Sequence, residues 1–227
     1  RKNYKINALT TITKKSIPYW KEIIDEYVKH GFDKIHLRFL DYLGEAQNKW
    51  NKVGYKAQEF NKFWESALNY IMKLNQKGIK IEERTVKIIL KKMVKNIEPN
   101  YSELRNPCGA ITSQLLYNYD GKIYMCDEAR MMKSDTFCLG EIDQYKNYDK
   151  LLEQKKTLDI INSCFIENYR CNKCEFKRYC GICPIANSFE KNKFSEYRCK
   201  ILHFQFRFIK KILNKNPTKR KIILNWL

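Results

Sequence analysis

The segment CNKCEFKRYCGIC, from Cys171 to Cys183, holds four cysteines in two close pairs. Its Cys-x2-Cys-x5-Cys-x2-Cys spacing gathers four thiols around a small volume, as either a zinc site or an iron–sulfur cluster requires. Zinc sites of this kind usually separate the two pairs by roughly a dozen or more residues. Pro184, directly after the last cysteine, matches the Cys-Pro ending of bacterial ferredoxin runs. The spacing therefore favours an iron–sulfur cluster and leaves zinc as the alternative.

Nine cysteines occur in the 227 residues, and all of them lie from Cys108 onward. The first residues, RKNYKINALTTITKK, contain no apolar stretch followed by small residues and so do not form a signal peptide. We therefore expect a cytoplasmic protein, in which clustered cysteines are more often metal ligands than disulfides. No apolar run has the roughly 18 to 20 residues that cross a bilayer, so no membrane partner is expected. Because the first residue is Arg1, we also expect a piece of a longer protein.

The formal net charge of +19 has two interpretations. A strongly basic protein can bind nucleic acid, but here the charge is mostly lysine, spread along the chain as on solvated faces. Residues 200–227 differ, since they hold eight lysines and arginines and no acid. Such a segment suits an acidic partner or peptide. Nucleic acid is therefore not the partner we expect.

The N-terminal part of the chain alternates between strand and helix patterns. β-Branched residues and period-2 alternation predict strands over residues 4–13 and 34–40. Apolar residues at helical spacing predict helices that end near Gly31 and Gly78, and a third helix over residues 86–93. This alternation of strand and helix predicts βα units on a parallel sheet. Two such units are too few for a closed barrel.

The pattern changes at Pro107, where turn signals replace helical periodicity. The strand-like stretches 115–119 and 122–126 flank Asp120-Gly121, which predicts a β-hairpin. Residues 164–199 are rich in cysteine and poor in apolar residues, so we expect metal to hold them together. The predicted organisation is an α/β domain over residues 1–100, a small cysteine-rich domain with a hairpin and helices over residues 101–205, and a basic C-terminal helix and tail over residues 206–227.

The order of the cysteines along the chain is more specific than any one pair. Cys108-x12-Gly121-x4-Cys126 is followed by the four-cysteine segment and, after fifteen residues, by Cys199. This order resembles the seven-cysteine signature of the SPASM domain, the C-terminal extension of many radical S-adenosylmethionine (SAM) enzymes that act on peptides and proteins. One departure is the two residues, not the usual three, between Cys180 and Cys183.

The resemblance extends beyond the cysteines. Residues 1–100 resemble the last βα units of the radical SAM partial barrel. The stretches NPCGAITSQLLYNYDGKIYMCDEARMM (106–132) and CEFKRYCGICPIANSF (174–189) are most similar to the maturases of the His-Xaa-Ser peptide system and their relatives. The resemblance implies the C-terminal part of an enzyme that modifies a ribosomally made precursor peptide and takes electrons from a donor.

The resemblance also implies two auxiliary [4Fe–4S] clusters with interleaved ligands, which would transfer electrons, anchor the substrate peptide, or do both. The fourth ligand of the proximal cluster has three candidates: Cys164 as the better one, Cys138, or an open iron that binds substrate. Cys138 lies in the strand-like FCLGEI and is expected to be a buried thiol. The implied sets are Cys171, Cys174, Cys180 and Cys199 for the distal cluster, and Cys108, Cys126, Cys183 and the fourth ligand for the proximal one.

The sequence has no Cys-x3-Cys-x2-Cys triplet, which holds the cluster that binds SAM in radical SAM enzymes. SAM and a third [4Fe–4S] cluster are therefore expected only in the intact enzyme. The missing N-terminal half would lie in the same chain or in a separate one. We expect these 227 residues alone to have no radical activity.

Two further residues are candidates for the site. Asp127 follows Cys126, and an acid at this position is proposed as the general base in the anaerobic sulfatase maturases, a SPASM family; the alternative is an ordinary surface carboxylate. Arg38 lies on the strand face opposite Ile35 and Leu37, where it would contact SAM or a substrate carboxylate, or else form a structural ion pair. The three histidines are interpreted as structural.

Two other functions stay open at this point. A basic zinc protein that holds nucleic acid would be colourless and would bind with a steep salt dependence. A stand-alone iron–sulfur electron carrier would have clusters but no substrate. Iron, sulfide and zinc analysis distinguishes these metal classes.

Overall fold

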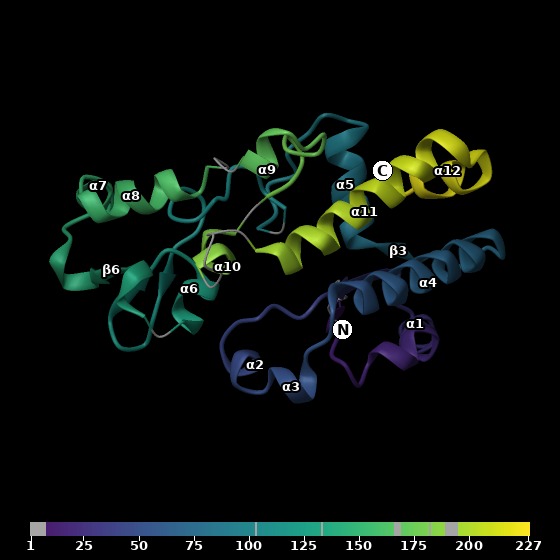
Figure 1. Ribbon diagram of the computed structural model, residues 1–227, viewed down its shortest axis with the longest axis horizontal. Coiled ribbons are helices and arrows are strands. Elements are labelled where there is room, and N and C mark those ends of the chain that lie inside the picture. The colour runs from purple at the N-terminus through teal and green to yellow at the C-terminus, as the bar shows by residue number, and fades with distance from the viewer. Residues whose placement is uncertain (1–7, 103, 133, 166–168, 182, 189–194) are drawn as a thin grey trace, which may run out of the picture. The chain divides into compact units, whose positions relative to one another are not determined.

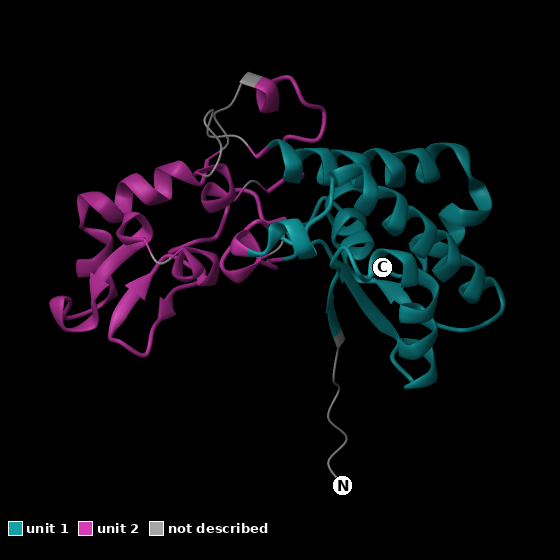
Figure 2. Cartoon of the chain, turned by 60° about the horizontal axis from the view of Figure 1, so that its bottom comes forward, with its two compact units in different colours: residues 1–41, 49–99, 196–227 teal, residues 42–48, 100–195 magenta. Residues whose placement is uncertain are grey.

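The computed structural model describes residues 8–102, 104–132, 134–165, 169–181, 183–188 and 195–227 (Figure 1). The chain forms two compact units (Figure 2). Unit 1 comprises Arg1–Asp41, Lys49–Pro99 and Glu196–Leu227, and unit 2 comprises Tyr42–Asn48 and Asn100–Ser195.

Unit 1 contains a parallel sheet of three strands in the order β1-β2-β3. Ala8 pairs with Ile35, and Ile35 pairs in turn with Glu83, so the strands run in register side by side. The chain returns between strands through helices, as parallel pairing requires. The strands are β1 (Ala8–Thr11), β2 (Lys34–Arg38) and β3 (Glu82–Glu83), and the helices between them are η1 (Ile17–Tyr19), α1 (Trp20–Lys29), α2 (Glu45–Asn48), α3 (Trp50–Val53) and α4 (Ala57–Gln76).

The longest connecting helix supplies most of the core of unit 1. Phe60, Trp64 and Leu68 recur every fourth residue along α4 and are fully buried, so they lie on one face of the helix. Burying a side chain of this size contributes about 1.5–3 kcal/mol. α5 (Arg84–Met93), α11 (Glu196–Lys215) and α12 (Pro217–Leu224) complete the unit, and α11 packs on both α4 and α5.

The α/β pattern predicted for the N-terminal part is confirmed, with differences in detail. Residues 4–7 of the first predicted strand lie outside the described residues, and β1 covers the remainder up to Thr11. β3 has two residues, too few to show a period in the sequence. β2 is buried at Ile35, His36 and Leu37, so side chains on both of its faces are covered.

Unit 2 contains an antiparallel sheet in the order β4-β5-β6, formed by β4 (Leu116–Tyr117), β5 (Lys122–Tyr124) and β6 (Cys138–Glu141). The predicted hairpin is confirmed: Gly121 has φ +81°, a conformation that glycine adopts without strain. The Asp120 carboxylate accepts a hydrogen bond from the Lys122 N–H at 3.1 Å and closes the turn. The strand expected in FCLGEI is β6.

Short helices surround this sheet and share an apolar core with it. The core contains Ile123, Met125, Ala129, Ile160 and Ile185, all buried. Unit 2 is therefore better packed than its cysteine-rich segment alone predicts. The helices are α6 (Asp127–Met131), η2 (Asp135–Phe137), η3 (Ile142–Gln144), α7 (Tyr148–Leu152), α8 (Lys155–Ser163), α9 (Tyr169–Asn172) and α10 (Pro184–Ser188).

The compact units differ from the predicted domains at the C-terminal end. The predicted limit between residues 205 and 206 falls inside α11, which is one continuous helix of unit 1. The reason is burial: Ile201, Phe206 and Ile209 lie on its inner face and are fully buried. Near the predicted limit between residues 100 and 101, the main segment of unit 2 begins at Asn100. Among the described helices, none combines the length and apolar composition of a membrane span.

Candidate metal centre

Four cysteines of unit 2 lie in or against its apolar core. Cys126 precedes α6, Cys164 follows α8, and Cys183 precedes α10. Cys126 and Cys164 are core members with 4% and 3% of their surface exposed, and Cys108 and Cys183 pack against that core. Three helix ends and one loop thus bring these residues to one region of the unit.

The four thiols interact with one another. Cys164 and Cys108 share a side-chain hydrogen bond, and Cys183 and Cys126 lie near enough that negative charge on either would raise the pKa of Cys164. Negative charge on Cys183 would likewise raise the pKa of Cys126. The Ile160 carbonyl, 3.5 Å from the Cys164 sulfur, is a second acceptor for the single proton of this thiol. The structure therefore groups Cys164, and not only Cys108, Cys126 and Cys183, in this region.

Burial and neighbouring groups raise the pKa of two of these thiols, those of Cys164 and Cys126. The hydrogen bond to Cys108, then burial, raises the pKa of the Cys164 thiol. Burial, then the Glu128 carboxylate, raises the pKa of the Cys126 thiol. A metal or cluster binds thiolates and removes their protons, so it would supply the positive charge that this apolar region lacks. The donor set fits a group held by four cysteines.

The described side chains do not form a ready-made site for a metal ion. Within the part of the chain that the structure describes, no three His, Cys, Asp or Glu side chains are arranged to hold one. The observations that bear on a cluster are the hydrogen bond between Cys164 and Cys108 and the position of Cys126 and Cys183 at the same apolar core.

Cys171 lies in the short helix α9, and Cys174 and Cys180 lie in the turns that follow it. The Cys174 N–H donates to the Cys171 carbonyl at 3.0 Å, and the Cys180 N–H donates to the Phe176 carbonyl at 2.9 Å. Phe176 is 2% exposed and anchors the loop by its side chain. The predicted distal ligands from this segment are therefore close in the chain and held by backbone turns.

Cys199 lies in unit 1, near the start of α11. The residue before it, Arg198, forms an ion pair with Asp41. Tyr197 donates a hydrogen bond from its phenol to the Leu40 carbonyl at 3.0 Å. Two contacts within unit 1 thus fix this turn of the helix against the chain that follows β2. The grouping of Cys199 with the other distal ligands stays a prediction.

Cys138 has different surroundings. It lies in β6 with 7% of its surface exposed, and its thiol donates to the Gly140 carbonyl at 3.9 Å. Its strand partner is Tyr124, whose pKa is raised mainly by burial and slightly by Cys138. Cys138 is a buried thiol of the sheet.

Asp127 and Arg38 occupy different positions in the fold. Asp127 begins α6 and is half exposed, and its carboxylate accepts hydrogen bonds from Arg130 Nε at 3.1 Å and Nη2 at 2.7 Å. Such an i,i+3 pair is typical of an exposed helix face. Arg38 ends β2 opposite Thr11 and is half-buried. It therefore lies at the carboxyl end of a parallel strand, where ligands of α/β folds bind.

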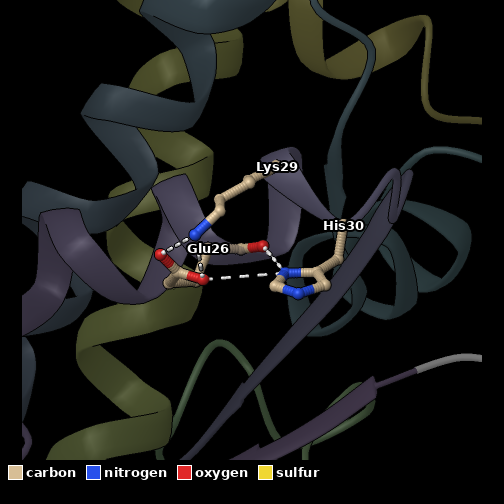
Figure 3. Close-up of polar contacts among 3 residues, drawn as sticks. All are labelled: Glu26, Lys29 and His30. Atoms are coloured by element: carbon tan, nitrogen blue, oxygen red, sulfur yellow. Dashed lines mark hydrogen bonds and ion pairs between the residues drawn. The ribbon is translucent and has the colours of Figure 1, made fainter.

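The histidine at the end of α1 makes surface contacts. Figure 3 shows His30 and Lys29 around Glu26. His30 Nδ1 donates to the Glu26 carbonyl oxygen at 2.8 Å, and Lys29 Nζ lies 3.1 Å from the Glu26 carboxylate. All three side chains are more than half exposed. This arrangement caps the helix and agrees with a structural histidine.

A buried carboxyl group at Glu83 is absent from the sequence-based expectations. Its oxygens accept hydrogen bonds from the Val86 N–H at 2.9 Å and the Leu37 N–H at 3.3 Å, and the residue is fully buried. Burial raises the pKa of Glu83 to about 7. Glu83 caps α5 and ties it to β2. Glutamate is not a preferred N-cap residue, so no sequence rule points to it.

A second unpredicted group surrounds the chain after β2. The Tyr55 phenol accepts a hydrogen bond from the Leu40 N–H at 2.7 Å, and burial raises the pKa of both Tyr55 and Tyr197. Tyr55 also stacks on Phe60 with ring centroids 5.9 Å apart. Because Tyr197 and Leu40 are 157 residues apart, no local pattern reveals their contact.

Two features define the class of fold: an α/β unit with a three-stranded parallel sheet, and a small unit whose apolar core contains cysteines. No protein-family model and no curated protein matches the chain. Solved structures of anSMEcpe, an anaerobic sulfatase-maturating enzyme of the radical SAM, SPASM type, do match.

Two of these structures show the extent of the match. The hexahistidine-tagged anSMEcpe with bound AdoMet has a TM-score of 0.69 and 20% identity over 97% of this chain. "Native anSMEcpe with bound AdoMet and Kp18Cys peptide" has a TM-score of 0.68 and 19% identity over 92% of it. The chain spans 57% of each of these two proteins. At this identity the similarity shows the fold.

Proposed function

We propose that this chain is the C-terminal, cluster-bearing portion of a radical SAM enzyme that modifies a ribosomally synthesised peptide. The observation that carries the proposal is the gathering of Cys108, Cys126, Cys164 and Cys183 in and against one apolar core of unit 2, where Cys164 and Cys108 share a hydrogen bond. The fold similarity to anSMEcpe with bound AdoMet supports the radical SAM class. The peptide-bound anSMEcpe structures support a peptide substrate.

These four cysteines would hold the proximal [4Fe–4S] cluster, with Cys164 as its fourth ligand. A cluster bound there supplies one-electron transfer. The apolar side chains around Cys126 and Cys164 exclude water from the site, and such burial tunes the potential of a bound cluster. Cys171, Cys174 and Cys180 would be distal ligands, and the sequence order supports adding Cys199.

Asp127 and Arg38 are the proposed polar groups of the active enzyme. Arg130 holds the Asp127 carboxylate with two hydrogen bonds and so orients it as a proton acceptor. Arg38 would bind a carboxylate of SAM or of the peptide, as its guanidinium geometry favours. SAM binding also needs a Cys-x3-Cys-x2-Cys segment, which these 227 residues do not contain. The proposed setting is the cytoplasm, with an electron donor as a further partner.

Anaerobic reconstitution with iron and sulfide tests the metal class. We expect brown protein with about eight irons per chain, that is, two clusters of four. Colourless protein with one or two zinc ions would refute it. The purified 227-residue chain should release no 5′-deoxyadenosine from SAM under reducing conditions, and its release would contradict the absence of a SAM-binding cluster.

Two cysteine variants test the division of ligands. Cys108→Ala should lose the proximal cluster and Cys199→Ala the distal one, each keeping about four of the eight irons. The two variants should therefore retain different EPR signals. Loss of the same signal from both would show that Cys108 and Cys199 serve one cluster.

A further inference from the structure

Gly181 makes a close backbone contact in the cysteine-rich loop. A Cβ atom at this position would lie 2.3 Å from the Arg105 carbonyl oxygen and 2.7 Å from the Leu104 carbonyl carbon. Both neighbours are main-chain atoms and do not move as a side chain does. Glycine is the residue that permits such an approach between two backbones.

A second contact joins the same two segments. Asn106 Nδ2 donates a hydrogen bond to the Lys177 carbonyl at 2.9 Å. Residues 104–106 are therefore held at two points of the loop, one before Cys180 and one after it. Leu104 is 7% exposed and Gly181 is buried, so this contact is an internal one.

The contact lies beside two of the proposed ligands. Cys108 follows Asn106 by two residues, and Cys183 follows Gly181 by two residues. We propose that Gly181 is a positioning residue for the proximal cluster: its lack of a side chain sets the distance between the Cys108 and Cys183 segments. This inference rests on the proposed function, since it assumes that those cysteines are ligands of one cluster.

Gly109 offers a matched control, because it contacts the same arginine in another way. A Cβ at Gly109 would meet the Arg105 side chain, at 2.8 Å from Cδ and 2.9 Å from Nη1. These atoms form the far end of a flexible side chain and can turn away. Neither glycine has a positive φ, so alanine adds only bulk at both positions.

Anaerobic reconstitution of both glycine variants tests the proposal. Gly181→Ala should fall from about eight irons to about four and lose the EPR signal that Cys108→Ala loses, while Gly109→Ala keeps both clusters. Full iron content and an unchanged EPR spectrum in Gly181→Ala would overturn the inference and leave the proposed function intact. A wild-type chain without iron would instead overturn the proposed function.

Asn106→Ala provides a second variant in case Gly181→Ala does not fold by far-UV circular dichroism. It removes the hydrogen bond to Lys177 and leaves Gly181 in place. We expect it to keep both clusters but to shift the EPR spectrum and reduction potential of the proximal one alone. A general loss of packing would lower the melting temperature without such a shift. An unchanged proximal spectrum in Asn106→Ala would therefore overturn the proposal.

Discussion

The two units of this chain reach stability by different means. Unit 1 has long helices whose apolar faces cover a parallel sheet, with Trp64, Phe60 and Phe206 fully buried. Unit 2 has a sheet of short strands and a core into which cysteines intrude, including Cys126 and Cys164. The difference shows that unit 1 is held mainly by apolar burial. On the proposed function, unit 2 would be completed by the cluster that its thiols hold.

The largest expected effect is that of metal removal on unit 2. Removing the clusters should destabilise unit 2 by several kcal/mol, because binding free energy of a metal group is folding free energy. Unit 1 contributes only Cys199 to the proposed ligands and should lose less stability. Hydrogen exchange with mass spectrometry should show a larger increase of exchange in α8 and β5 than in α4. Equal protection of both units before and after chelation would contradict this difference.

Truncation of a large core side chain of unit 1 should destabilise unit 1 and leave unit 2 unaffected. Phe206→Ala should destabilise unit 1 by about 3–5 kcal/mol, since Phe206 is fully buried in α11. The iron content of unit 2's proximal set should stay unchanged. Tyr119→Ala is the control, because Tyr119 is 99% exposed and its loss should change stability by less than about 0.5 kcal/mol. Denaturant unfolding followed by hydrogen exchange measures the stability of both variants.

A smaller effect is the pH dependence of unit 1. The pKa of Glu83 is raised from 4.5 to about 7 in the folded chain. Between pH 4.5 and pH 7 the folded state therefore keeps a proton that the unfolded state has lost. Stability should therefore be highest below about pH 4.5 and should fall as pH rises through 7, by on the order of 3 kcal/mol. Glu83→Gln stays neutral at all pH values and should flatten this profile; a profile unchanged by Glu83→Gln would exclude Glu83 as its source.

A small stability effect, below that of the core and pH changes, is expected at the proposed proton acceptor. Asp127→Asn should change the free energy of unfolding by less than about 1 kcal/mol, because the pair with Arg130 is exposed. In the intact enzyme the same variant should lower the rate of peptide modification by roughly 10²- to 10⁴-fold. Full activity of this variant would reduce Asp127 to a surface carboxylate.

The sequence predicts the parts of this fold that repeat locally. The stripe of α4, the βα order of unit 1 and the Asp120-Gly121 hairpin follow from helical spacing, alternation and turn chemistry. The cysteine order directed attention to the thiols that the structure groups in unit 2. Each of these signals is contained within a few residues or in a fixed spacing.

The remaining features depend on contacts between distant residues. The Arg198–Asp41 ion pair joins positions 157 apart, and the two-residue strand β3 is fixed by its neighbour β2. The hydrogen bond between Cys108 and Cys164 depends on where α8 ends in space. Gly181 is one glycine among eight in the sequence, and only the approach of the Arg105 backbone distinguishes it.

The most direct test of the central claim compares two buried cysteines, Cys164 and Cys138. They are 3% and 7% exposed, and the structure places only Cys164 in contact with Cys108. After anaerobic reconstitution, Cys164→Ala should lose or alter the proximal EPR signal, while Cys138→Ala should keep the wild-type spectrum and about eight irons. The opposite result, a lost signal in Cys138→Ala and a wild-type spectrum in Cys164→Ala, would contradict the proposed cluster site.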